Sequence, residues 1–303
     1  MENETAFLCG AQGPDFLLIH RGFPWQLGRS LMEAGRKIHW LSPSRFLEAA
    51  RDFLVRSPEK DAARSYLLGF LSHYAFDRTA HPYVYSQIEI WQASNPKISK
   101  SECHARIETA LDVIMLRYLR GQTPLDLPLK RIYPRLPEGE GEIAAMLAFA
   151  LRQAFGESAP EALLLQAMND FRLSQRLLND PTLLKKPFME RLERLFKASF
   201  PVSSYIRPLS EGEDDFANVQ HDPWQNPYED PPQKHTEDFF ALYDRAYTLS
   251  VSLIDGFRKS LADPSLDLYS LTGDISYETG LPAKPEDYRP KEKKHCSAGQ
   301  RSP

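Results

Sequence analysis

Apolar residues recur at helical spacing through most of this chain, whereas runs in which apolar and polar residues strictly alternate are short and few. Apolar side chains at that spacing lie on one face of a helix, where they can pack on a core. The pattern therefore predicts an all-α protein. The expected helices cover residues 44–56, 57–81, 101–121, 141–156, 160–178 and 182–198, with a last helix starting near Thr236.

Two of the expected helices have clear boundary signals. Ser57 followed by Pro58 is a typical helix start, because serine caps the first turn and proline fits the first helical position. This helix is expected to end near Pro82. The next is expected to begin at Ser101, which can act as a cap, and to end at Gly121.

Two stretches between the helices have loop composition. Residues 122–140 hold four prolines and are expected to form a surface connection. Residues 201–235 are long for a structureless loop, so we expect them to pack over the helices through Trp224 and other aromatic side chains. The polar, charged chain from about residue 285 is expected to be a mobile tail.

Composition narrows the class of protein. Lys and Arg number 37 against 41 Asp and Glu, a formal net charge of -4, which gives no electrostatic basis for binding duplex nucleic acid. Three widely spaced cysteines argue against a disulfide framework and against a cysteine zinc site. No apolar run approaches the roughly 18 residues that span a bilayer, and the acidic N-terminus does not resemble a secretory signal. The chain as it stands is therefore expected to be soluble and cytoplasmic, and its composition fixes no oligomeric state.

One expected helix carries histidine, aspartate and histidine four residues apart, at His73, Asp77 and His81. Side chains at this spacing lie one above the other along an edge of the helix. The following helix repeats the spacing with His104 and Glu108. Two neighbouring helices thus offer five imidazole and carboxylate groups.

These groups are the ligands of catalytic zinc, which takes about three protein donors and keeps one position for water. Five donors exceed one such site but can serve two metal ions that share ligands, an arrangement suited to phosphoryl chemistry. The alternative is a polar helix edge satisfied by solvent or by core groups. This alternative is stronger for the pair His104 and Glu108 than for the first three residues, because about one such pair is expected by chance among the remaining histidines.

The order of these fragments resembles the zinc-dependent phospholipase C family, whose helical fold is shared with zinc-dependent single-strand nucleases. The most specific part is Gly69-Phe-Leu-Ser-His73 followed by Asp77 and His81-Pro82. The flanking fragments that agree in order are Gly-Pro-Asp15, His39, His104-x-x-x-Glu108-x-x-x-Asp112, Trp224-x-Asn-Pro and Phe239-x-x-Leu-Tyr-Asp-x-Ala. The resemblance runs over residues 7–257 and implies one helical domain over residues 1–284, with the tail over residues 285–303.

The resemblance also implies a ligand set. One zinc ion would be held by His39, His73 and Asp77, and a second by His81, His104 and Glu108. Asp15 would lie beside the bridging water, as a ligand or as the general base. The family's third zinc takes the N-terminal residue and a histidine upstream of the Gly-Pro-Asp turn, but residues 1–13 contain no histidine and leave no room for a first helix that carries one. Either the start of the chain is missing, in which case we expect a secreted protein, or the protein works with two zinc ions.

The function implied by the resemblance is hydrolysis of a phosphodiester, such as a phospholipid, by a zinc-activated water. The alternatives are a single-strand nuclease with the same metal core and a non-catalytic zinc-binding helical protein. The overall charge does not favour the nuclease, which needs a positive groove. The absence of an obvious basic amphipathic helix argues against a lipid substrate in particular.

Overall fold

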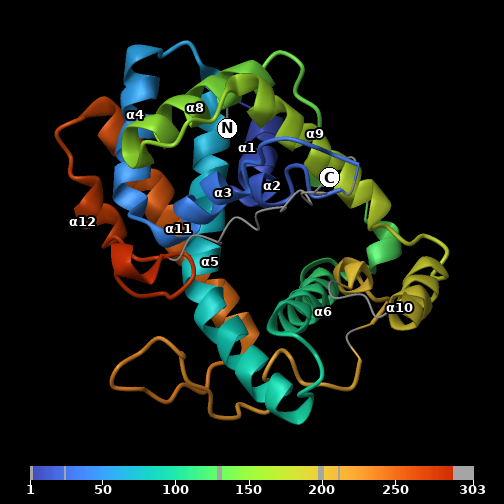
Figure 1. Ribbon diagram of the computed structural model, residues 1–303. Coiled ribbons are helices and arrows are strands. Elements are labelled where there is room, and N and C mark those ends of the chain that lie inside the picture. The colour runs from blue at the N-terminus through green and yellow to red at the C-terminus, as the bar shows by residue number, and fades with distance from the viewer. Residues whose placement is uncertain (1–2, 24, 128–131, 197–200, 211, 289–303) are drawn as a thin grey trace, which may run out of the picture.

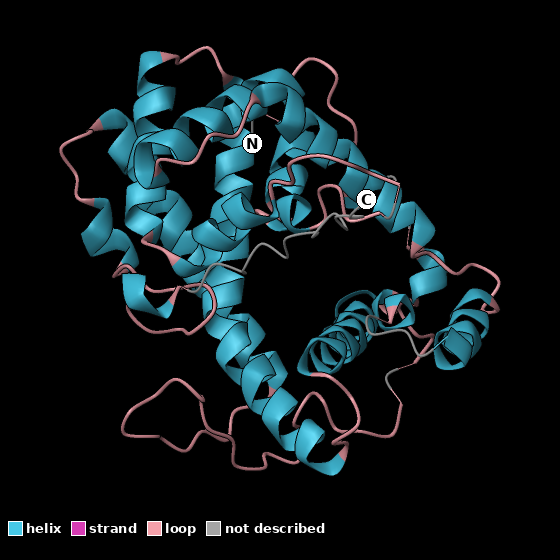
Figure 2. Cartoon of the chain, viewed as in Figure 1, coloured by secondary structure: helices cyan, strands magenta, loops and turns pink. Residues whose placement is uncertain are grey.

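The computed structural model describes residues 3–23, 25–127, 132–196, 201–210 and 212–288. Within these ranges the regular elements are helices, and β-structure is limited to the isolated bridges Trp224–His235 and Ile275–Pro282 (Figures 1 and 2). This confirms the prediction of an all-α fold. The α-helices are α1 (Glu4–Gly10), α2 (Asp15–Leu18), α3 (Met32–Trp40), α4 (Pro43–Arg56), α5 (Asp61–Ser94), α6 (Lys100–Arg120), α8 (Glu140–Phe155), α9 (Glu161–Leu177), α10 (Lys185–Phe196), α11 (Phe239–Ala262) and α12 (Leu268–Thr272). The 3-10 helices are η1 (Pro124–Asp126), η2 (Val202–Tyr205) and η3 (Pro285–Asp287).

Helix α5 is the longest of the described helices and runs through the molecule, with α1 and α11 packed along it (Figure 1). The prediction that it ends near Pro82 is wrong, because it continues to Ser94. Proline removes a backbone hydrogen bond and costs about 3 kcal/mol inside a helix. The turns beyond Pro82 offset this cost because they bury Tyr83 and Ile88 in an apolar cluster.

The other predicted boundaries fall close to the observed ones. Helices α4, α6, α8 and α9 begin and end near the expected residues. Ser57 does not start a helix, since its backbone N–H bonds to the Leu54 carbonyl and ends α4. Ser99, instead of Ser101, caps α6. The expected end of α10 and all of the tail beyond residue 288 fall outside the described residues.

Helices α1, α2 and α3 were not expected, because they are only 7, 4 and 9 residues long and show too little periodicity. Helix α1 lies before the Gly-Pro-Asp turn, but it carries no histidine. The Asn3 side chain caps α1 by accepting a hydrogen bond from the backbone N–H of Ala6. The backbones of α1 and α5 touch, since a Cβ on Gly10 would lie 1.9 Å from the Tyr66 carbonyl oxygen.

The core consists of two apolar clusters that meet along α5. The larger cluster joins the N-terminal half of α5 to α1, α4, α8 and α9. The smaller joins the C-terminal half of α5 to α6 and the start of α11, and the loop over residues 201–235 adds Phe216 and Trp224 to it. This loop therefore packs over the helices, as expected. The polar stripe from His73 to His81 lies on α5 where the two clusters meet.

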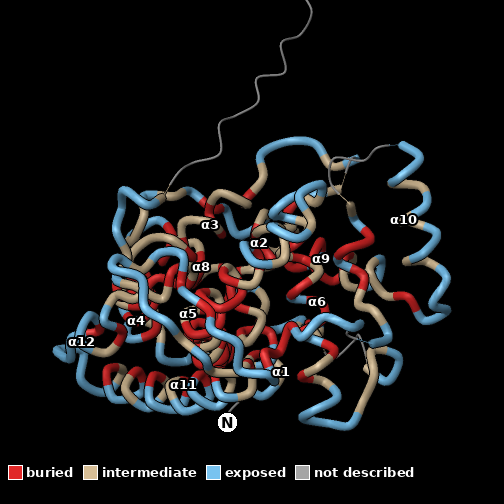
Figure 3. Tube along the Cα trace, turned by 90° about the horizontal axis from the view of Figure 1, so that it is seen from below, coloured by how far each residue is buried: buried red, intermediate tan, exposed pale blue. Residues whose placement is uncertain are grey.

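The expectation that the chain lacks a basic amphipathic helix is wrong. Helix α10 lies at the edge of the molecule and is mostly exposed (Figure 3). It presents Phe188 and Leu195 to solvent beside Arg191 and Arg194. Among the described residues, no helix combines the length and the apolar character needed to cross a membrane.

Candidate metal centre

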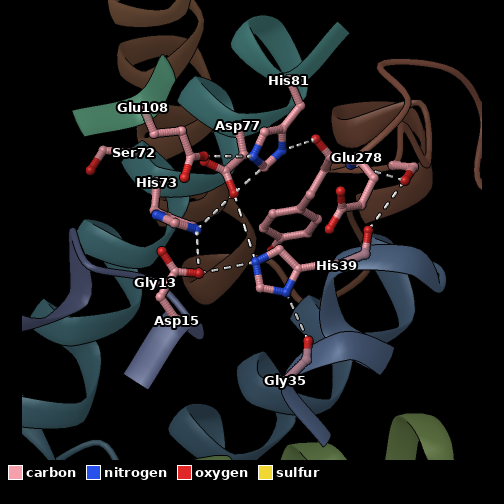
Figure 4. A network of polar contacts seen from close by, with 12 residues as sticks. Gly13, Asp15, Gly35, His39, Ser72, His73, Asp77, His81, Glu108 and Glu278 are labelled. Carbon is pink, nitrogen blue, oxygen red and sulfur yellow. Dashed lines mark hydrogen bonds and ion pairs between the residues drawn. The ribbon is translucent and has the colours of Figure 1, made fainter. Parts of the chain in front are cut away.

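Side chains from α2, α3, α5 and α6 converge on one region of the molecule, and most of them are shown in Figure 4. They form two groups of possible metal ligands, and within each group the ligand atoms lie within 4.8 Å of one another. The inner group contains Asp15, His39 and His73, and the outer group contains His81, His104 and Glu108. Each group takes one histidine from α5, His73 or His81. The polar helix edge predicted from the sequence therefore contributes to both groups.

The inner group is deeply placed. His39 Nε2 lies 3.2 Å from Asp15 Oδ1, and His73 Nε2 lies 3.8 Å from the same oxygen. Asp77 also belongs to this group, because its Oδ2 lies 3.0 Å from His73 Nε2 and 3.8 Å from His39 Nε2. Two imidazoles and two carboxylates therefore face one another, and Asp15 stands among the possible ligands instead of only beside them.

The outer group is more open. His104 Nε2 lies 2.8 Å from Glu108 Oε1, and His81 Nε2 lies 3.7 Å from the same oxygen. The Glu108 side chain is 47% exposed, against 11% for Asp77. Three donors facing a solvent-accessible side match a zinc site that keeps one position for water. His104 and Glu108, whose spacing alone did not exceed chance, thus come together with His81.

Backbone carbonyls fix the direction in which two of the imidazoles point. His39 Nδ1 lies 2.8 Å from the carbonyl of Gly35, and His81 Nδ1 lies 2.9 Å from the carbonyl of Tyr277. When each Nδ1–H donates to its carbonyl, the lone pair of Nε2 faces the ligand group. The segment that carries Tyr277 is held in place by Gly280, which packs on the proline ring inside α5.

The turn that carries Asp15 depends on Gly13. Its φ is +54°, in the left-handed region that glycine adopts without steric cost, and a Cβ there would lie 2.1 Å from Cδ2 of His73. The Gly13 carbonyl accepts a hydrogen bond of 3.2 Å from the buried hydroxyl of Tyr66. The turn therefore lies directly on the His73 ring, which brings the Asp15 carboxylate to the inner group.

In the inner group, the carboxylates raise the pKa of the histidines by more than burial lowers it. Burial disfavours the charged imidazolium of His39, but the hydrogen bond and the charge of Asp15 raise its pKa to about 9. The pKa of His73 is also raised against burial, by Asp77 and then Asp15. Conversely, burial acts to raise the pKa of Asp77, but His73 and His81 hold it below its usual value.

The same balance holds in the outer group. Burial lowers the pKa of His81 and His104, but nearby carboxylates, chiefly Asp77 and Glu108 for His81 and Glu108 for His104, raise both. The two imidazoles in turn hold the pKa of the Glu108 carboxyl far below its usual range, against the effect of burial. Without a metal, protons therefore bind at the positions where a cation would be coordinated.

The donor set fits zinc. Ligand atoms bound tetrahedrally at about 2.0–2.2 Å lie about 3.3–3.6 Å from one another. The inner-group separations of 3.2 Å for His39 with Asp15 and 3.8 Å for His73 with Asp15 are close to these values. His73 Nε2 is buried and makes no hydrogen bond, although Asp77 Oδ2 lies 3.0 Å away. A buried nitrogen is rarely left without a partner, and a cation at this point would supply one.

Both groups open into a cleft of about 480 Å³. Its lining combines possible ligands, including Asp15, His73 and Glu108, with apolar side chains. Arg207 also lines the cleft, and its Nε donates a 2.7 Å hydrogen bond to Asp112 Oδ2. Asp112, which continued the spacing on α6, thus pairs with an arginine and belongs to neither ligand group.

Tyr277 and Glu278 were not predicted from the sequence, because they lie far along the chain from His73, Asp77 and His81 and repeat no spacing. Glu278 contributes to the raised pKa values of His39, His81 and His104. The remaining described histidines lie outside both groups. They are His20, His221 and His235.

The fold and the site define a class: helical proteins in which one long helix supplies ligands to two neighbouring metal groups. A family model described as "Zinc dependent phospholipase C" matches residues 1–152, half of the chain, and this match includes every residue of both groups. The chain belongs to the zinc-dependent phospholipase C family, which confirms the resemblance. No curated protein and no solved structure matches it significantly. The family and the two groups together support zinc as the cofactor and, in general terms, a phospholipase C-like hydrolase.

Proposed function

We propose that the protein is a zinc-dependent phosphodiesterase that hydrolyses a phospholipid, or a similar diester, into an alcohol and a phosphomonoester. The observation that carries the proposal is that two groups of zinc-type ligands, about two turns apart on α5, open into the same cleft. Two metals at such a site suit in-line displacement at phosphorus.

We assign the ligands by group. Asp15, His39, His73 and Asp77 would hold the inner zinc, and His81, His104 and Glu108 the outer zinc. When bound, zinc supplies Lewis acidity toward the phosphoryl oxygens and lowers the pKa of water toward 7. Asp77 is assigned to the inner zinc because its Oδ2 lies 3.0 Å from His73 Nε2 and 3.8 Å from His39 Nε2.

The protein's own groups orient the reactants. The Asp15 side chain is 45% exposed and faces the cleft, so its carboxylate can accept a proton from the attacking water. The water oxygen forms a bond to phosphorus, the bond from phosphorus to the alcohol oxygen breaks, and the alkoxide takes a proton from solvent. Arg207, in the cleft wall, contributes positive charge to bind the phosphate.

The apolar side of the cleft favours a lipid over a nucleotide. Phe76, Val84, Leu111 and Met115 line it together with Phe239. Apolar side chains bind acyl groups through burial of apolar surface. Among the described lining residues, Arg207 is the single Lys or Arg, so a continuous positive groove for single strands is not formed.

The test uses the purified full chain. Mass spectrometry of the metal content is expected to find about two zinc ions per chain, and a chromogenic phosphocholine diester is expected to be hydrolysed. Chelation should abolish hydrolysis, and added zinc should restore it. The control variant is His221→Asn, which changes an exposed histidine outside both groups and should keep full activity. Cleavage of single-stranded DNA without cleavage of the diester, or bound zinc with neither activity, would contradict the proposal.

A further inference from the structure

Helix α10 leaves one apolar face in solvent. Leu184, directly before the helix, and Phe188 and Leu195 within it are 71%, 59% and 72% exposed. Their spacing of four and seven residues places them on the same side of the helix. Single exposed apolar residues are normal, but a continuous stripe on a protruding helix marks an interaction surface.

The opposite face of α10 is fixed to the protein. The Lys186 ammonium donates to the carbonyls of Ser203 at 3.0 Å and Ile206 at 2.7 Å. The Glu193 carboxylate accepts a 2.9 Å hydrogen bond from the Ser203 backbone N–H. The apolar stripe is therefore held outward, away from η2, and does not fold back onto the molecule.

Positive charge accompanies the stripe. Arg191 and Arg194 are exposed, and the helical period places Arg191 on the same side as Phe188 and Leu195. Glu193 on the inner side is engaged by η2. The whole chain has a formal net charge of -4, so the exposed arginines of α10 carry the sign opposite to the net charge of the protein. Arginines beside an apolar stripe complement the anionic headgroups of a lipid surface.

The stripe continues toward the catalytic cleft. A small hollow at the end of α9 is lined by the partly exposed Leu125, Leu183 and Leu209. Its wall shares Leu178 and Arg207 with the wall of the cleft. The hollow thus connects the segment just before α10, through Leu183, to the cleft that holds both ligand groups.

We propose that α10 docks the protein onto an anionic phospholipid surface, with the helix lying in the headgroup region and the cleft turned toward the lipid. The orientation of the cleft rests on the proposed phospholipase C-like function, whereas docking rests on α10 itself. Arg191 and Arg194 would contact headgroup phosphates, while Phe188 and Leu195 enter the acyl boundary.

Sedimentation with vesicles of phosphatidylcholine and phosphatidylserine tests docking without any need for hydrolysis. The double variant Phe188→Gln with Leu195→Gln is expected to bind at least about tenfold more weakly. The charge variant Arg191→Gln with Arg194→Gln is expected to lose about fivefold per arginine, and this loss should vanish at high salt. Glutamine preserves helix propensity, and circular dichroism would verify that α10 stays folded.

A matched control changes exposed apolar residues on the far side of the molecule, near α12 (Figure 1). Leu266 and Tyr269 are 42% and 57% exposed there, and Leu266→Gln with Tyr269→Gln should leave vesicle binding unchanged. Equal vesicle binding by the wild type and the α10 double variant would overturn the proposal. So would a concentration-dependent dimer in ultracentrifugation that the double variant abolishes, since α10 would then bind a second copy of the chain.

Hydrolysis separates this inference from the proposed function. The α10 double variant should hydrolyse the soluble phosphocholine diester at the wild-type rate and vesicle lipid at least about tenfold more slowly. If the wild type hydrolyses neither substrate while the double variant still loses vesicle binding, the function fails and docking stands. If the variant hydrolyses each of the two substrates at the wild-type rate, docking through α10 has no role in hydrolysis and the proposed function stands.

Discussion

The inner and outer ligand groups share one helix but differ in how they are built. The inner group joins α2, α3 and α5, and the His39 and His73 side chains are 3% and 9% exposed. The outer group joins α5 to α6, and Glu108 is 47% exposed. The inner group is therefore part of the core and its metal should couple to folding, whereas the outer group lies at the cleft surface and its metal should couple mainly to catalysis.

The largest effect is expected from Asp77→Asn, because Asp77 stands between the groups. The amide keeps the size of the side chain but lacks its charge. Zinc content should fall to about one ion per chain, because the ligands of the outer group remain, and diester hydrolysis should fall by more than about a hundredfold. Metal analysis and the chromogenic assay measure both, and a variant that retains both would remove Asp77 from the centre.

The comparison is tested most directly by removing one histidine from each group. His104→Ala should release about one zinc ion and abolish hydrolysis, with little change in melting temperature. His39→Ala should release the inner zinc and also lower the melting temperature by several degrees, because a buried metal links three helices. Equal thermal shifts in the two variants would show that the groups do not differ in their coupling to folding.

Gly13→Ala is expected to weaken the inner group without removing a ligand. The methyl group would meet the His73 ring, and the positive φ is strained for alanine, at a cost of about 1–3 kcal/mol. Zinc affinity should drop by about tenfold at the inner group and stay unchanged at the outer one. Gly212→Ala provides the control, since it also has positive φ but no atom within 4 Å of the added Cβ.

The metal-free protein should respond to pH through His39. Its pKa is raised from 6.5 to about 9, so its stabilisation is complete below pH 6.5 and is lost as the pH rises toward 9. The loss is on the order of 3 kcal/mol. Urea unfolding of chelator-treated protein would measure it. His39→Gln should make the profile less steep without flattening it, because the pKa values of His73, His81 and His104 are also raised. A zinc-loaded sample should instead gain stability over this range, because metal binding displaces the protons.

The smallest effect is expected from Glu278→Gln, which removes a charge near both groups but no proposed ligand. Since Glu278 contributes to the raised pKa values of His39 and His81, its loss should weaken zinc binding by a few fold. Titration with a competing chelator would measure this change. A complete loss of one zinc ion would mean that Glu278 is itself a ligand.

The sequence predicted the parts of this molecule that are set by local spacing. His73, Asp77 and His81 could be placed on one helix edge because the helical period fixes their direction, and most long helices were found for the same reason. Asp15 and His39 were placed only by the family resemblance, because their helices are too short to show a period.

The parts that failed depend on tertiary contacts. Pro82 predicted a helix end, but burial of the following turns outweighs the proline penalty. The carbonyl of Tyr277 reaches His81 only through folding of the C-terminal segment, which no local pattern announces. Helix α10 was expected as a helix, yet its apolar stripe became visible only once its inner face was seen bonded to η2.

Because α5 continues through Pro82, the distance between the α5 ligands of the two groups is fixed. His73, Asp77 and His81 are carried on one rod, so the spacing of the groups is set by the helical rise, about 6 Å for every four residues, and cannot respond to domain movement. His104 and Glu108 are carried by α6 and not by this helix. Their distance from the inner group therefore depends on how α6 packs against α5, whereas the spacing of His73, Asp77 and His81 does not.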